Sequence, residues 1–151
     1  MMMEHGRETL QVRAYAKINL GLLVTRKRSD GFHEIATVFH RIDLCDEITL
    51  RSAPGITVES TNADVPDGEA NICHRAALLL RDELDVDAGM HCAIIKRIPV
   101  GAGLGGGSAD GAAVLRSLPA LWGISPNETT LRSIALRLGS DVSYFLAAGL
   151  G

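Results

Sequence analysis

Pro99-Val-Gly-Ala-Gly-Leu-Gly-Gly-Gly-Ser-Ala109 is the most informative stretch of this chain, and five of its residues are glycine. Glycine adopts positive φ readily, so a run of glycines can turn several backbone N–H groups toward one point. The apolar segment before it, residues 90–100, is typical of a strand that ends at Pro99. The alanine- and leucine-rich segment after it, residues 112–123, is typical of a helix. A strand, a glycine loop and a helix N-terminus together predict a phosphate-binding site.

A flexible or tightly packed turn is the other interpretation of glycine-rich sequence, and for a lone G-x-G-x-x-G it is about equally frequent. Two common phosphate loops are excluded here. No lysine follows the glycines as in G-x-x-x-x-G-K-[ST], and the early strand-turn-helix context of the dinucleotide fingerprint is missing. The pattern therefore indicates a third type of phosphate loop.

The first half of the chain reads as antiparallel β structure. Residues 11–24 and 33–52 are rich in strand formers, and a charged turn at 26–31 separates them. A break at Pro54-Gly55 precedes a short third piece, residues 55–60. These features predict a hairpin arm followed by a shorter strand.

The second half reads mainly as helix. Apolar residues recur at spacings of three and four between Asn71 and Leu84, which predicts an amphipathic helix. Ser125-Pro126-Asn127-Glu128 predicts the start of a last long helix, which runs to about Leu138 and ends at Gly139. The terminal FLAAGLG, residues 145–151, resembles the entry to another strand.

The composition predicts one soluble globular domain. The chain has 151 residues, of which 46% are hydrophobic and 22% charged. No apolar run approaches the roughly 20 residues of a membrane span, and nothing resembles a signal peptide, so we expect a cytoplasmic protein without a membrane partner. The net charge of −3, with scattered Lys and Arg, argues against nucleic acid. The cluster at residues 26–28 is either a solvated turn or a contact to a small phosphate.

Cysteine and histidine spacing gives no metal site. We expect three reduced cysteines, because no C-x-x-C and no Cys/His pair at zinc-ligand spacing occurs. The histidines at 5, 40, 74 and 91 form no metal spacing either.

The P-x-x-x-G-L-G-G-G-S pattern of residues 99–108 resembles the second motif of the GHMP kinases, named for galactokinase, homoserine, mevalonate and phosphomevalonate kinases. Two other stretches agree: AYAKINLGLLVTRKRSDGFHEIATVF (14–39) and LGSDVSYFL (138–146). The three motifs keep the family's order and span residues 13 to 150. Within the superfamily they look like the diphosphocytidyl-methylerythritol kinases.

The resemblance implies the fold and the reaction. The fold would be the GHMP kinase N-terminal domain over residues 1–151, an α+β structure like domain 2 of ribosomal protein S5, with a mostly antiparallel sheet packed against helices. The reaction would be transfer of phosphate from ATP, accompanied by Mg²⁺, to the 2-hydroxyl of 4-diphosphocytidyl-2-C-methyl-D-erythritol in the non-mevalonate isoprenoid pathway.

The resemblance also assigns roles to residues. Asp141 would be the base that accepts the hydroxyl proton, and Lys17 would orient it and offset charge on the transferred group. From composition alone, Lys17 reads as a solvated strand residue and Asp141 as a helix cap. The ATP loop would consist of Pro99, Val100, Gly101, Ala102, Gly103, Leu104, Gly105, Gly106, Gly107, Ser108 and Ala109.

The cytidyl substrate would contact Asn19, Asp30, Gly31, Phe32 and His33. Phe32 replaces the tyrosine of the family's D-G-Y-H, and its ring can still stack on cytosine while His33 bonds the polar edge. Asn19 lies two residues from Lys17 and therefore on the same face of a strand. Ala109 replaces a second serine, which leaves Ser108 and Asp141 to contact magnesium. A mostly hydrated ion is equally reasonable, so we assign no metal ligand.

Such kinases have a second domain of comparable size, which closes over the cleft and is missing from residues 1–151. We therefore expect a truncated chain with feeble activity. The resemblance allows a homodimer for the longer enzyme. Two alternatives are another GHMP kinase acting on homoserine or a mevalonate derivative, and a non-enzymatic S5-like binding module.

Overall fold

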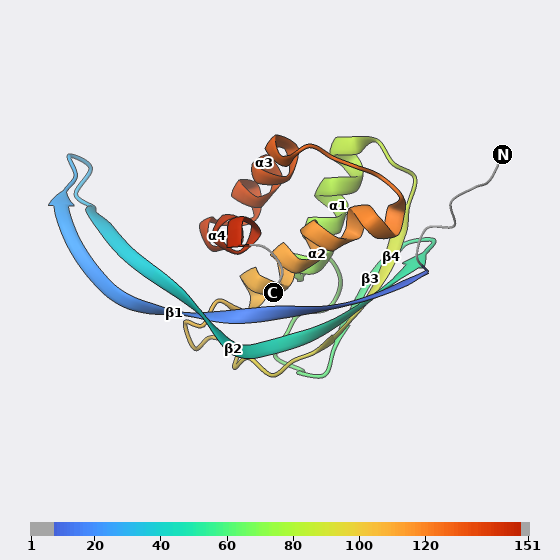
Figure 1. Ribbon diagram of the computed structural model, residues 1–151, viewed down its shortest axis with the longest axis horizontal. Helices are drawn as coiled ribbons and strands as arrows, with labels where there is room; N and C mark the ends of the chain where they lie inside the picture. The colour runs from blue at the N-terminus through green and yellow to red at the C-terminus, as the bar shows by residue number, and fades with distance from the viewer. Residues whose placement is uncertain (1–7, 149–151) are drawn as a thin grey trace.

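The computed structural model describes residues 8–148, which fold as a four-stranded sheet with helices on one face (Figure 1). The sheet order is β1-β2-β4-β3. The strands are β1 (Thr9–Lys27), β2 (His33–Ala53), β3 (Ile56–Ser60) and β4 (Gly89–Ile95). The helices are η1 (Gly68–Ala70), α1 (Ile72–Leu84), α2 (Gly106–Trp122), α3 (Glu128–Leu138) and α4 (Ser140–Ala148).

The predicted α+β class and the mostly antiparallel sheet are confirmed. β1 pairs antiparallel with β2, and β2 pairs antiparallel with β4. β3 departs from the antiparallel prediction, because it pairs parallel with β4. The chain returns from β3 to β4 through α1, and such a crossover makes neighbouring strands parallel.

The two long strands form an arm that extends past the helices (Figure 1). Its turn contains an ion pair of 2.8 Å between Arg28 and Asp30, with both side chains exposed. The basic cluster at 26–28 therefore lies at the exposed end of the arm.

The core lies between the sheet and the helices. Leu50 and Ile94 on the sheet, Leu80 on α1, and Leu115 and Leu118 on α2 are all buried. Alternate residues of each strand face this core, which leaves the opposite side chains on the other face of the sheet.

Three helix boundaries agree with signals in the local sequence. Asn71 caps α1 by accepting from the amide of Cys73 at 2.8 Å, and Asn127 caps α3 by accepting from Thr130 at 2.8 Å. Gly139 follows the last residue of α3, as predicted.

Three predicted boundaries are wrong, and one of them is the start of α2, which lies at Gly106 and not at residue 112. β4 ends at Ile95 and not at Pro99, because the amides of Arg97 and Ile98 bond the side chain of Asp46 instead of a neighbouring strand. Residues 145–148 are not the entry to a strand but the end of α4, whose apolar side chains at Val142, Phe145 and Leu146 are buried. Residues 149–151 of that prediction lie outside the described part of the chain.

Cys45, Cys73 and Cys92 are free, as predicted. Among residues 8–148, no group of three or more His, Cys, Asp or Glu side chains could hold a metal ion. His5 lies outside this range. The described helices include none that is long and apolar enough to cross a membrane.

Candidate active site

The glycine loop lines a cleft of about 470 Å³ between the start of α2 and the segment before α1. All of the loop residues from Pro99 to Ser108 line it. Ala109, the last residue of the predicted ATP loop, does not line the cleft. Its amide donates to the carbonyl of Gly105 at 2.8 Å, and its side chain is buried in the core.

The loop conformation requires glycine at several positions. Gly101, Gly103 and Gly105 have φ values of 74°, 76° and 70°, in the left-handed region that side chains other than glycine disfavour. A Cβ on Gly105 would also lie 3.0 Å from the ring of Phe145 and 3.2 Å from Cε of Lys17. The glycines therefore serve both backbone geometry and close packing.

The N-terminus of α2 is open to a ligand. Its N-cap is Gly105, which offers no side chain to bond the first amides of the helix. The first N–H groups of any α-helix lack intrahelical acceptors, and the helix dipole adds positive potential at this end. The arrangement is therefore suited to an anion such as a phosphate.

Lys17 joins β1 to this loop. Its backbone amide donates to the carbonyl of Leu104 at 2.9 Å, at a place where the β1–β2 pairing is irregular between Tyr15 and Lys17. Its ammonium donates to Asn19 Oδ1 at 3.1 Å and lies 4.5 Å from the centre of the Phe39 ring. The predicted shared face of Lys17 and Asn19 is thus observed.

Lys17 and Asp141 approach each other from opposite ends of the sequence. Their Nζ and Oδ2 atoms are 3.9 Å apart, and both residues line the cleft. The Lys17 side chain is only 7% exposed, whereas Asp141 is 38% exposed. A buried cation beside a reachable carboxylate is an arrangement in which the carboxylate can meet a substrate proton.

The remaining predicted substrate residues lie elsewhere. Asp30, Gly31, Phe32 and His33 occupy the exposed end of the β1–β2 arm and do not line the cleft. Phe32 is 72% exposed. The structure therefore brings together Lys17, Asn19, Asp141 and the glycine loop, but not the four residues of the arm.

Sequence reasoning missed several cleft residues. Lys96 and Asp110 flank the glycine loop in the sequence, and that proximity was the available signal. No local pattern distinguishes the wall formed by Asp64, Val65, Pro66, Ala70, Asn71 and Ile72.

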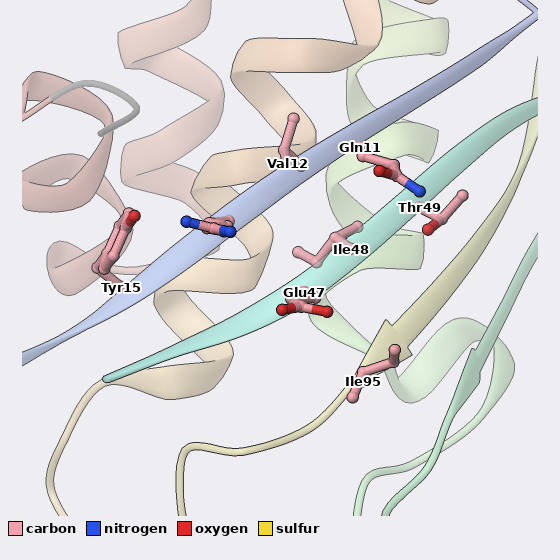
Figure 2. A pocket seen from close by; sticks show the side chains of 8 residues that line it. Gln11, Val12, Tyr15, Glu47, Ile48, Thr49 and Ile95 are labelled. Atoms are coloured by element: carbon pink, nitrogen blue, oxygen red, sulfur yellow. The ribbon is translucent and has the colours of Figure 1, made fainter. Parts of the chain in front are cut away.

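A second hollow, of about 580 Å³, lies on the sheet itself (Figure 2). Figure 2 shows its side chains coming from β1, β2 and the end of β4, including Gln11, Tyr15, Glu47 and Ile95. It contains neither the glycine loop nor the Lys17 and Asp141 pair. The candidate catalytic residues therefore lie in the cleft and not in this hollow.

Comparison with protein families gives a match over just over half of the chain. The model described as "GHMP kinases N terminal domain" matches residues 71–149. The chain belongs to the GHMP kinases.

Individual relatives of this GHMP kinase agree. A 4-diphosphocytidyl-2-C-methyl-D-erythritol kinase from Prosthecochloris aestuarii is 47% identical over 142 residues, covering 94% of the chain and 50% of the relative. A protein of the same name from Salinibacter ruber is 47% identical, covering 88% of the chain and 47% of the relative. The crystal structure of a 4-(cytidine 5'-diphospho)-2C-methyl-D-erythritol kinase superposes with a TM-score of 0.79 at 36% identity, covering 94% of the chain and 52% of that structure. The chain spans about half the length of the relatives it matches.

Proposed function

We propose that this chain carries the ATP-binding and catalytic half of a kinase that phosphorylates the 2-hydroxyl of 4-diphosphocytidyl-2-C-methyl-D-erythritol. The observation that carries the proposal is the Lys17 and Asp141 pair, 3.9 Å apart, beside a glycine loop at a helix N-terminus. The names of the relatives at 44–49% identity support this substrate over others of the superfamily.

In the reaction, the glycine loop and the start of α2 hold the phosphates of ATP through backbone N–H groups. Asp141 accepts the proton of the substrate hydroxyl. The hydroxyl oxygen forms a bond to the γ-phosphorus of ATP as the bond between that phosphorus and the β-phosphate oxygen breaks. Lys17 holds Asp141 and offsets negative charge on the transferred group. The products are the 2-phosphate and ADP.

Several neighbours keep Lys17 in place. Asn19 accepts a hydrogen bond from its ammonium, the Phe39 ring lies beneath it, and the ring of Tyr144 packs against Phe39 with centroids 4.9 Å apart. A cation over an aromatic face is stabilised by the ring quadrupole. These contacts restrict the ammonium to the side of the cleft where Asp141 lies.

Magnesium would come with ATP, bound mainly by phosphate oxygens and water. Ser108 and Asp141 line the cleft and offer oxygen ligands, which suit Mg²⁺. The described residues include no preformed cluster of metal ligands, so a mostly hydrated ion fits them better than a dedicated protein site.

Asp30, Gly31, Phe32 and His33 would contact the cytidyl group from the arm. Phe32 is exposed and free to stack on a base, and the amide of Phe32 bonds the Asp30 carboxylate at 3.1 Å, which shapes the turn. Because the arm extends beyond the helices, these contacts require a substrate that reaches from the arm to the cleft.

Isothermal titration tests the proposal. The folded chain should bind ATP, and CDP should compete with the cytidyl substrate because both present the same base and phosphates. Binding of homoserine or mevalonate, with no binding of the cytidyl substrate, would assign the chain to another GHMP substrate class. If the folded chain, alone and extended by a second GHMP domain, bound neither ATP nor the cytidyl substrate, the proposed function would be wrong.

A further inference from the structure

Three buried charged side chains lie directly beneath the glycine loop. The Lys96 ammonium is 2.5 Å from Asp46 Oδ2 and 2.8 Å from Asp110 Oδ2. All three side chains are at least 96% buried. Burying charges is costly unless they are paired, so such a cluster needs good geometry to persist.

Asp46 also fixes the path of the chain into the loop. Its Oδ1 accepts from the amides of Arg97 and Ile98, at 2.6 Å and 2.8 Å. These two residues carry the chain out of β4 toward Pro99. Hydrogen bonds to an ionised acceptor are stronger than neutral ones, so one carboxylate holds two consecutive amides at the start of the loop.

Lys96 links Asp46, before the loop, to Asp110, which follows the loop in α2. Asp110 lies in the first part of α2, after Ser108 and Ala109, while Asp46 lies on β2. A Cβ on Gly106 would be 3.0 Å from Lys96 Nζ and 2.9 Å from Ile98. The first residue of α2 therefore packs directly on the cluster.

The charges of the cluster leave one excess carboxylate. Burial raises the pKa of Asp110 well above its ordinary value, although the Lys96 ammonium opposes this and Asp46 adds to it. Burial would lower the pKa of Lys96, but the two carboxylates raise it overall. The titratable groups around Asp110 are Lys96, Asp46 of β2 and the Cys73 thiol of α1.

We propose that Asp46, Lys96 and Asp110 are positioning residues that hold both ends of the glycine loop, so that its N–H groups are preorganised for the phosphates of a nucleoside triphosphate. The inference rests on the proposed ATP-binding function. Because a preorganised loop needs no ordering when the ligand binds, its loss weakens affinity for the triphosphate. The arm that would contact the cytidyl group lies outside the cleft, so affinity for CDP stays unchanged.

Asp46→Asn tests this, with Glu47→Gln as a matched control. Glu47 is the next residue along β2, and its ion pair with Arg97, at 2.6 Å, is partly exposed on the open face of the sheet. Both variants exchange a carboxylate for an amide, but only Asp46→Asn alters the cluster.

Hydrogen exchange without nucleotide is the first measurement. We expect the Arg97 and Ile98 amides to exchange about tenfold faster in Asp46→Asn, with Leu131 and Ile134 in α3 unchanged and Glu47→Gln like wild type. Unchanged exchange at the two amides, or equal acceleration throughout the chain, would overturn the proposal. If Asp46→Asn does not fold, exchange of the same two amides in the wild-type protein tests the proposal. Protection as strong as that of the α3 amides requires the hydrogen bonds to Asp46. Exchange as fast as in an exposed loop would contradict those bonds.

Nucleotide titration of the same proteins is the second measurement. Asp46→Asn should weaken ATP binding about tenfold and leave CDP binding unchanged, whereas Glu47→Gln should alter neither. Equal loss for both ligands would indicate general destabilisation and overturn the positioning role. A wild-type chain that binds no nucleotide would instead disprove the proposed function, while the exchange result would still decide whether the cluster holds the loop.

Discussion

Gly105 and Gly107 belong to the same glycine-rich sequence but differ in whether the structure requires glycine there. Gly105 has a φ of 70° and packs against Phe145 and Lys17. Gly107 lies in the first turn of α2, and a Cβ there would meet nothing within 4 Å. The sequence motif contains glycine at both positions and does not distinguish them. The structure shows that Gly105 requires glycine for its backbone conformation, whereas Gly107 has space for a side chain.

Gly105→Ala should therefore destabilise the chain, by roughly 1–2 kcal/mol for the left-handed backbone and more if Phe145 cannot move. Gly107→Ala should be close to neutral, because alanine favours the helix. Urea denaturation of both variants measures the difference. Equal stability of the two would mean that the loop does not adopt the described conformation.

Asp110 gives a prediction about pH. Burial raises its pKa, so the folded state binds this proton more tightly than the unfolded state does. The resulting stability is fully present below the ordinary aspartate pKa and is lost as pH rises through the higher pKa of the folded state. Asp110→Asn removes this loss, so as pH rises above the ordinary aspartate pKa the free energy of unfolding should fall less for the variant than for wild type. Parallel pH profiles in denaturant titrations would contradict the assignment.

The starts of α1 and α3 were more predictable than the end of β4. The caps Asn71 and Asn127 follow from local chemistry, which a sequence contains in full. The end of β4 depends on Asp46, a residue some fifty positions earlier whose role no local pattern reveals. α4 was missed because the glycines that follow its apolar residues resembled a strand entry, while burial against the core favours the helix.

The two capping asparagines allow a matched test. Each Asn→Ala change should cost about 0.5–2 kcal/mol of stability. Asn71→Ala should cost more than Asn127→Ala, since Asn71 is buried and its Nδ2 also donates to the Pro66 carbonyl at 2.9 Å. Thermal or urea unfolding measures both, and a larger loss for Asn127→Ala would contradict the described role of Asn71.

The molecule as a whole combines a well-packed core with a long arm and an open cleft (Figure 1). The three sequence motifs predicted that Lys17, Asn19, Asp141 and the glycine loop belong to one site, and the structure places them together. The distance between Lys17 and Asp141 depends on the whole fold, so only the resemblance to the GHMP kinase motifs could predict that the two residues meet. The separation of Phe32 and His33 from the cleft could not be predicted, because it depends on how far the arm extends.

Phosphoryl transfer depends on positioning and on exclusion of water, and the cleft described here is open. The chain by itself should therefore turn over weakly or not at all. The chain spans half of the Prosthecochloris aestuarii relative, and joining it to the other half of that protein should raise turnover. Robust turnover by residues 1–151 alone would contradict this expectation.

The most direct test of the account is transfer of labelled phosphate from ATP to 4-diphosphocytidyl-2-C-methyl-D-erythritol by this extended chain, with and without Asp141→Asn. We predict product with the unmutated protein and a loss of at least about a hundredfold in turnover with Asp141→Asn, which removes the general base but preserves the shape of the side chain. Undiminished turnover in the Asp141→Asn variant, or no product from a folded extended chain that does phosphorylate another GHMP substrate, would contradict the proposed site or its substrate.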